Sequence, residues 1–130
     1  MAVTLSCPPI ADTGTLANPQ KSKGDRAELE LAELLSDLTG YRCRRYLGAG
    51  RQDDVGDIDG IPGHAIQCAS WKDTAAAAVQ KPRGAAQQAV NGDMPYAATF
   101  VRFRGGTWRV VLTPEQWNAY LQAINPTHNT

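Results

Sequence analysis

The chain of 130 residues lacks the segments that direct a protein to or through a membrane. It contains no run of 18 apolar residues and no basic segment followed by an apolar one near its start. A membrane-spanning helix and a secretion signal both need such segments. Cysteine is also scarce, because Cys7, Cys43 and Cys68 are an odd number without close spacing, which argues against a disulfide framework. We therefore expect a cytoplasmic protein with no membrane partner.

Net charge is absent as well. The 13 basic residues equal the 13 acidic residues, which at first argues against a nucleic-acid partner. A zero sum does not say where the charges lie. Arginines gather between residues 41 and 52 with no acid among them, whereas acids gather between 25 and 37. Such segregation suits phosphate contacts, although cations at strand edges also serve to block aggregation.

Periodicity predicts the first elements. Apolar residues at helical spacing predict a helix over 24–39 with the buried stripe Ala27, Leu31, Leu34, Leu35 and Leu38. Its acids Asp25, Glu30, Glu33 and Asp37 should occupy the opposite, solvated side. Alternation predicts a strand at 41–47, and the turn residues after Ile58 should pair 55–58 with 65–70 as a hairpin. Pro82 and Gly84 should break the helical region 74–91 into two pieces.

The last third of the chain predicts a second hairpin and a final helix. Residues 96–103 and 107–112 flank a glycine turn, and Thr113 with Gln116 forms the pattern of a capping box. The helix after it presents an apolar face that needs burial in the core or in a dimer interface, with members Trp117, Tyr120, Leu121 and Ile124. We expect a mixed α/β (α+β) domain over 22–124, a flexible arm at 1–21 and a tail at 125–130.

Oxygen ligands gather around the first hairpin. Period two places Ala65, Gln67 and Ala69 on one face of its second strand, and the turn length allows Asp57 to lie beside Gln67. A carboxylate beside an amide oxygen is hard-oxygen ligation of the kind that Mg²⁺ accepts. The alternative is that Asp57 and Asp59 are ordinary turn formers.

Glu28 borders the buried stripe of the first helix. A carboxylate there needs a partner or a metal, because unpaired burial is costly. The alternative is an edge glutamate that reaches solvent.

Four segments in order carry a family resemblance. They are a helix opening Gly24-Asp-Arg-Ala-Glu28, a Gly-Ala-Gly loop at 48–50, Gly56-Asp57-Ile58, and a strand reading Ala65-Ile-Gln-Cys68. Over residues 22–112 these resemble the PD-(D/E)xK nuclease superfamily, and within it the small archaeal-type and phage Holliday-junction resolvases. The resemblance implies a restriction-endonuclease-like core, a mixed sheet flanked by helices. It also implies a homodimer that hydrolyses DNA phosphodiesters with Mg²⁺ or Mn²⁺, in the host cytoplasm if the chain is phage-encoded.

The resemblance also implies site residues. The family's helix glutamate matches Glu28, its first metal aspartate matches Asp57, and its second acidic position matches Gln67, a substitution that some branches make. The carbonyl between the paired ligands belongs to Cys68. A glutamine of the second helical region, Gln88 or its neighbour Gln87, matches one that often lies near the active site; the alternative is an exposed helix glutamine.

The family's lysine should fall two residues after Gln67, where this chain has Ala69. That ammonium is expected to orient the attacking water and offset negative charge in the transition state. The chain could be an engineered Lys-to-Ala form, a natural pseudo-nuclease, or a nuclease in which Lys72 or Lys81 has taken over. We favour the Lys-to-Ala inactive form, because the rest of the site persists.

The expected partner is branched or four-way-junction DNA. The cations assigned to its phosphates are Arg44, Arg45, Arg51, Lys72, Lys81 and Arg83. Trp71, beside the site, is expected to pack within the protein rather than stack on an unpaired base. The alternatives to a junction nuclease are a DNA-binding module that kept the fold and lost the chemistry, and a purely structural or regulatory phage protein.

Overall fold

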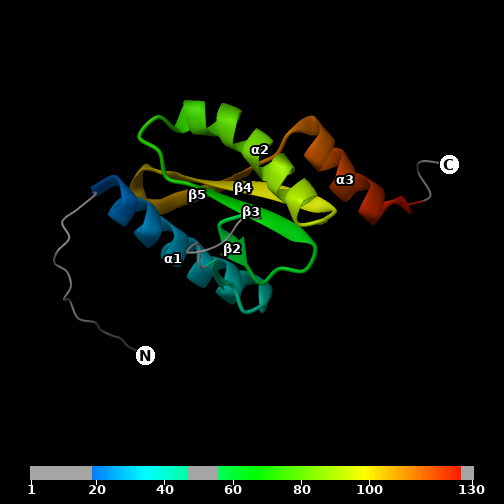
Figure 1. Cartoon of the computed structure of the whole chain (residues 1–130), viewed down its shortest axis with the longest axis horizontal. Coiled ribbons are helices and arrows are strands. Elements are labelled where there is room, and N and C mark those ends of the chain that lie inside the picture. The colour runs from blue at the N-terminus through cyan, green and yellow to red at the C-terminus, as the bar shows by residue number, and fades with distance from the viewer. Residues whose placement is uncertain (1–18, 47–55, 127–130) are drawn as a thin grey trace.

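A computed structural model describes residues 19–46 and 56–126 of the chain. These residues form helices and strands, with three strands in succession after the first helix (Figure 1). In chain order they are α1 (Pro19–Thr39), β1 (Arg44–Arg45), β2 (Ile58–Asp59), β3 (His64–Ala69), α2 (Thr74–Asn91), β4 (Tyr96–Phe103), β5 (Thr107–Val111) and α3 (Pro114–Ile124). No described helix combines the length and apolarity that crossing a membrane requires.

The strands form one mixed sheet in the order β1-β2-β3-β4-β5. Neighbouring strands are antiparallel except β3 and β4, which run parallel. Ile58 of β2 lies opposite Ile66 of β3, so the first hairpin is confirmed. The second hairpin is confirmed by the pairing of β4 with β5. With α1 on one face of the sheet and α2 and α3 on the other, the expected mixed α/β architecture is confirmed (Figure 1).

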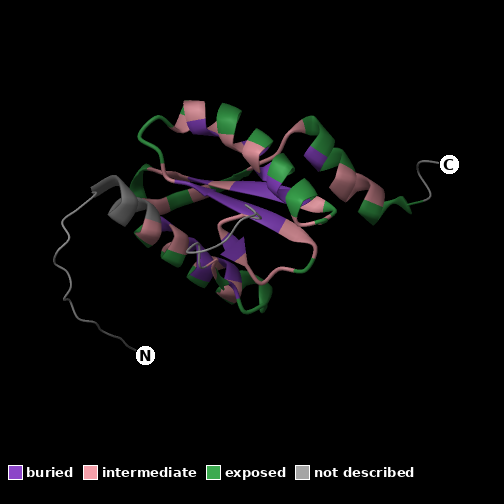
Figure 2. Ribbon diagram, viewed as in Figure 1, coloured by how far each residue is buried: buried purple, intermediate pink, exposed green. Residues whose placement is uncertain are grey.

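Alternate residues of β3 face different helices. Ile66 and Cys68 pack with Leu31 and other apolar residues of α1. Ala65 packs with alanines of α2, and so does Ala69. These buried residues line both faces of the central strands (Figure 2). The predicted division of β3 into two faces is confirmed, and the sheet is the middle layer of the molecule.

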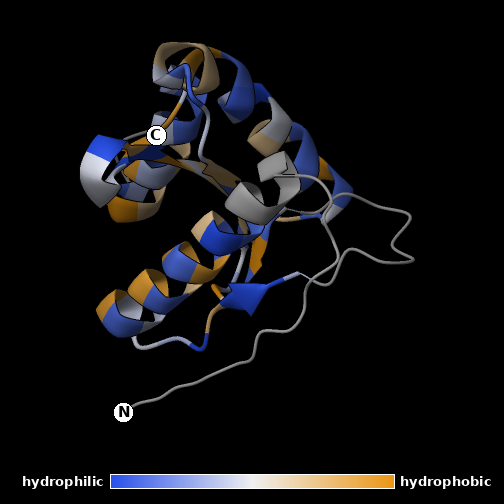
Figure 3. Cartoon of the chain, turned by 90° about the vertical axis from the view of Figure 1, so that its left-hand side faces the viewer, coloured by the Kyte–Doolittle hydropathy of each residue, from blue (hydrophilic) through white to orange (hydrophobic). Residues whose placement is uncertain are grey.

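Helix α1 differs from its prediction at both ends. It begins at Pro19 rather than near residue 24, which is compatible with the tolerance of a first helical turn for proline. Near its end, Leu38 is 73% exposed, so its expected burial was wrong. The backbone N–H of Cys43 donates to Ser36 Oγ at 2.9 Å. The returning chain therefore covers the Ser36 side of the last turn and leaves Leu38 in solvent. Figure 3 shows hydrophobic and hydrophilic residues interspersed along α1.

Helix α2 is continuous through Pro82, so the expected break into two pieces was wrong. The proline costs the helix one backbone hydrogen bond. Ala77 before it and Ala85 after it are both fully buried against the sheet, so packing on each side holds the helix together. Gln116 of α3 adds a tie, because its side-chain Nε2 donates to the Pro82 carbonyl at 2.9 Å.

Helix α3 begins as its sequence predicts and buries a different side. Thr113 and Gln116 form the capping box. Gln116 is the buried residue of the helix, and Tyr120, one turn later, stacks on Tyr96 with ring centroids 5.0 Å apart. Trp117 is 56% exposed, so its expected place in the core was wrong. Its place in a dimer interface stays a prediction.

The strand expected at 41–47 is confirmed only as the two residues of β1. The glycine loop at 48–50 and Arg51, which was assigned to DNA phosphates, lie outside the described residues. So do most of the expected N-terminal arm and the last residues of the C-terminal tail.

Candidate functional site

Asp57 lies beside the edge of β3 that faces β2, just before β2 begins. Its backbone N–H donates to the Ile66 carbonyl at 2.8 Å, and its side-chain Oδ2 accepts the backbone N–H of Cys68 at 2.8 Å. The N–H and C=O of one strand residue point to the same edge. The carbonyl of Cys68 therefore also faces the edge at which Asp57 lies.

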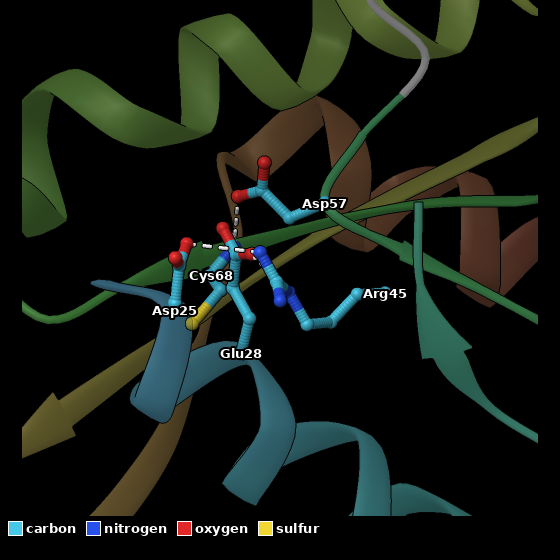
Figure 4. Close-up of polar contacts among 5 residues, drawn as sticks. All are labelled: Asp25, Glu28, Arg45, Asp57 and Cys68. Atoms are coloured by element: carbon cyan, nitrogen blue, oxygen red, sulfur yellow. Dashed lines mark hydrogen bonds and ion pairs between the residues drawn. The ribbon is translucent and has the colours of Figure 1, made fainter. Parts of the chain in front are cut away.

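Helix α1 brings two more carboxylates to this edge. Arg45 of β1 joins them, because its Nε donates to Glu28 Oε1 at 3.0 Å and its Nη2 donates to Asp25 Oδ1 at 2.9 Å. Figure 4 shows these side chains converging beside Cys68. We call Asp25, Glu28 and Asp57, with Arg45 between them, the acidic cluster. The structure thus brings Glu28, Asp57 and the Cys68 backbone together, as the sequence predicted.

Within the acidic cluster, the pKa of Glu28 and that of the neighbouring Cys68 thiol are raised. Burial raises the pKa of Glu28 above its ordinary value, the negative charge of Asp57 raises it further, and the hydrogen bond from Arg45 only partly opposes this. Burial, then Asp57, then Glu28 raise the pKa of the Cys68 thiol to about 12. The thiol is therefore neutral at physiological pH, and two carboxylates from different elements repel each other at this edge.

The raised pKa of Glu28 makes stability depend on pH. A carboxyl that binds its proton more tightly in the folded chain stabilises the fold below its unfolded pKa, and that contribution is lost as pH rises through the folded pKa. In EDTA, the unsubstituted chain should therefore lose stability relative to Glu28→Gln as pH rises from about 4.5 toward neutrality. Urea unfolding across this range measures the difference.

Glu33→Gln is the matched control, because Glu33 is an exposed carboxylate on the same helix. It should follow the unsubstituted chain at every pH. A Glu28→Gln profile parallel to that of the unsubstituted chain would show that the carboxyl of Glu28 is not perturbed by its neighbours.

Gln67 lies on the other face of the sheet from α1. It is 5% exposed and buried under α2, where a Cβ at Gly84 would lie 3.7 Å from its Nε2. Its side-chain Oε1 has no hydrogen-bond partner among the described residues. The face of β3 that carries Gln67 was predicted correctly, but this face belongs to α2, whereas Glu28 approaches from α1. Asp57 is at the edge between the two.

The position expected to carry lysine is closed by packing. Ala69 is 1% exposed and packs with Ala77 of α2 and Val101 of β4. Lys81 of α2 lies near enough to Cys68 for its charge to oppose the rise in the thiol pKa. Its Nζ is 5.6 Å from the centroid of the Trp71 ring. The charge of Lys81, one of the two lysines considered as replacements, therefore acts on Cys68.

The two candidate glutamines of α2, Gln87 and Gln88, differ in burial. Gln88 is 4% exposed, whereas Gln87 is exposed and donates from its Nε2 to Asn91 Oδ1 at 3.0 Å. Ala85 and Ala89, on either side of Gln88, pack with Ala65. Gln88 therefore lies over the first half of β3, and Cys68 is in the second half.

The cations assigned to phosphates fall into two groups. Arg44 pairs with Asp59 at 3.6 Å, and Arg45 is held by the acidic cluster, so both have carboxylate partners within the chain. Lys72 and Arg83 are exposed, and Lys81 is half-buried. Trp71, expected to pack within the protein, does so in part, because it is 37% exposed and Lys81 lies over its ring.

Two acids expected to face solvent have partners instead. Asp25 shares Arg45 with Glu28, and its spacing of three residues from Glu28 on one helix is a signal that could have found it. Glu30 accepts hydrogen bonds from Arg102 at 3.0 Å and from the indole of Trp108 at 2.7 Å. These bonds join α1 to β4 and β5 across a long stretch of sequence, and no local pattern indicates them.

Within residues 19–46 and 56–126, no group of three or more histidine, cysteine, aspartate or glutamate side chains has the arrangement of a metal site. No protein-family model, curated protein or solved structure matches the chain. A proposed function must therefore be argued from the geometry of the acidic cluster and from the charges around it.

Proposed function

We propose that the chain is an endonuclease of the junction-resolving type, which hydrolyses phosphodiesters of four-way DNA in the cytoplasm as a homodimer with Mg²⁺ or Mn²⁺. The observation that carries this proposal is the meeting of Glu28 and Asp57 beside the edge of β3 that faces β2. These carboxylates come from different elements and repel each other. Such repulsion is relieved by a divalent cation.

The oxygen donors at this edge fit a hard cation. Glu28 and Asp57 supply carboxylates, and the Cys68 carbonyl faces the same edge. The buried amide oxygen of Gln67, unpartnered among the described residues, lies on the α2 face of β3, away from the face that Glu28 approaches. When bound, the metal would supply a water of lowered pKa and offset charge on the phosphate.

The protein's own residues would prepare this edge. Arg45 holds Glu28 in place through its Nε and neutralises part of the cluster until the cation enters. Asp57 is fixed by the Cys68 N–H, so its second oxygen has a defined direction. Lys81 and the exposed Lys72 and Arg83 would bind the phosphates of the strand that approaches.

Junction binding and cleavage test this proposal directly. Gel-shift titrations compare a four-way junction with linear duplex of equal length, in Mg²⁺ and in EDTA, over a series of salt concentrations. We expect preference for the junction, affinity that falls steeply with salt, and weak cleavage in Mg²⁺ only. Equal affinity for junction and duplex, or affinity unchanged by salt, would contradict the proposal.

The tight packing of Ala69 favours a second candidate, a DNA-binding module that kept the nuclease fold without its chemistry. Ala77 and Val101 occupy the space around the position where a catalytic lysine is expected, and Arg45 already occupies the acidic cluster. This candidate predicts junction binding that is the same in Mg²⁺ and in EDTA, with no cleavage in either.

A further inference from the structure

A pocket of about 520 Å³ lies where the parallel strands β3 and β4 end. Ser70, Trp71 and Lys72 line it directly after β3, and Phe103 and Arg104 line it at the end of β4. In sheets with parallel strands, ligands bind in crevices outside the carboxyl ends of the strands. The pocket begins two residues after Cys68, so it lies beyond Cys68 along the direction of β3.

The charge of the pocket suits an anion. Lys72 and Arg104 are exposed cations, and none of its lining residues is an acid. Asp73, beside the pocket in sequence, uses its carboxylate to cap α2 by accepting the Ala76 N–H at 3.0 Å. Arg102 also lines the pocket, but its guanidinium is paired with Glu30. Lys72 and Arg104 therefore supply the available positive charge.

The pocket also offers an aromatic surface. Trp71 is 37% exposed, and Lys81 lies over one face of its ring, 5.6 Å from the centroid, so a base would stack on the other face. Bases of a single strand stack on such exposed rings, whereas the bases of a duplex are stacked on each other and are not available. A volume of this size falls within the range of small-ligand pockets, so it suits one nucleotide rather than a helix.

We propose that this pocket binds an unpaired nucleotide of a DNA strand, with its phosphate between Lys72 and Arg104 and its base on Trp71. The proposal rests on the proposed function and deepens it. It names an unpaired segment next to the scissile site as the part of branched DNA that the chain recognises.

Binding of fluorescein-labelled dT12, measured by anisotropy in EDTA, tests the pocket without the metal. The unsubstituted full chain should bind dT12 more tightly than a 12-base-pair duplex. Trp71→Leu should weaken dT12 binding about fivefold or more, the loss expected for one stacked base. Lys72→Ala and Arg104→Ala should weaken it and reduce its dependence on salt.

Arg109→Ala is the matched control, because Arg109 is an exposed cation of β5 outside the pocket. It should bind dT12 as the unsubstituted chain does. Free dTMP serves as a competitor: displacement of dT12 at equal nucleotide concentration would show a site for mononucleotides and overturn the assignment to a DNA strand. Thermal unfolding shows whether each variant is folded. If Trp71→Leu does not fold, the variants at the exposed Lys72 and Arg104 decide the outcome.

Unchanged dT12 affinity in Lys72→Ala and Arg104→Ala would overturn the pocket proposal. The same variants assayed on the four-way junction keep this failure separate from failure of the proposed function. If the pocket variants bind and cleave the junction as the unsubstituted chain does, only the pocket proposal is contradicted. If the pocket variants weaken dT12 binding but the unsubstituted chain shows no preference for a junction over duplex, only the proposed function is contradicted.

Discussion

An Asp57→Asn variant is expected to lose the thermal stabilisation that Mg²⁺ gives the unsubstituted chain. A ligand that binds only the folded state at ten times its dissociation constant adds about 1.4 kcal/mol, or roughly 5 °C in unfolding temperature. Asparagine retains an oxygen that accepts the Cys68 N–H, so the hydrogen bond at 2.8 Å is preserved while the charge is removed. Differential scanning fluorimetry in Mg²⁺ and in EDTA measures the change and needs no catalytic activity.

Asp57→Ala separates the structural role of this residue from its charge. It should lose the response to Mg²⁺ and also lower the free energy of unfolding by about 1–3 kcal/mol in EDTA, because the part-buried Cys68 N–H then lacks its acceptor. Asp59→Asn, a neighbouring carboxylate paired with Arg44, should retain the full response. If Asp57→Asn still responds to Mg²⁺ as the unsubstituted chain does, no cation binds at this edge.

The elements that the sequence predicted correctly are those set by local chemistry. The hairpin between β2 and β3 follows from a dense turn, and the start of α3 follows from the hydrogen bonds between Thr113 and Gln116. The errors depend on distant parts of the chain. Helix α2 continues through Pro82 because the sheet and Gln116 support it, and Trp117 is exposed because Gln116 and Tyr120 define the buried side of α3.

As with the fold, only part of the candidate site could be predicted from the sequence. Burial beside a helical stripe indicated Glu28, and the hairpin indicated Asp57, so two of the predicted oxygens lie at one edge. Period two assigns Gln67 to the same face as Ala69, but it does not say which helix covers that face. That choice depends on the packing of α1 and α2, and it places Gln67 under α2.

Part of the balanced charge of the chain is paired within the fold. Arg45 neutralises Asp25 and Glu28, Arg102 pairs with Glu30, and Arg44 pairs with Asp59. Several arginines that seemed in sequence to form a DNA surface therefore hold strands to α1 or to each other. Among the described residues, the exposed cations that line the pocket at the ends of β3 and β4 are Lys72 and Arg104.

An Ala69→Lys variant is expected to cleave a four-way junction in Mg²⁺ about 100-fold faster than the unsubstituted chain, which is the scale of effect for one positioned charge in a transition state. Ala69 is packed against Ala77 and Val101 at the end of β3, so the lysine must push these residues apart before its stem can carry the ammonium toward the approaching phosphate. Single-turnover cleavage of a labelled junction measures the rate.

Ala69→Met is the matched control, because methionine has similar bulk without charge. Both variants should lose about 1–3 kcal/mol of stability through overpacking against Ala77, and only the lysine should gain activity. A lysine variant that binds the junction and cuts no faster than the methionine variant would favour the DNA-binding module. Its acidic cluster would then have a structural role, with Arg45 as the permanent partner of Glu28 and Asp25.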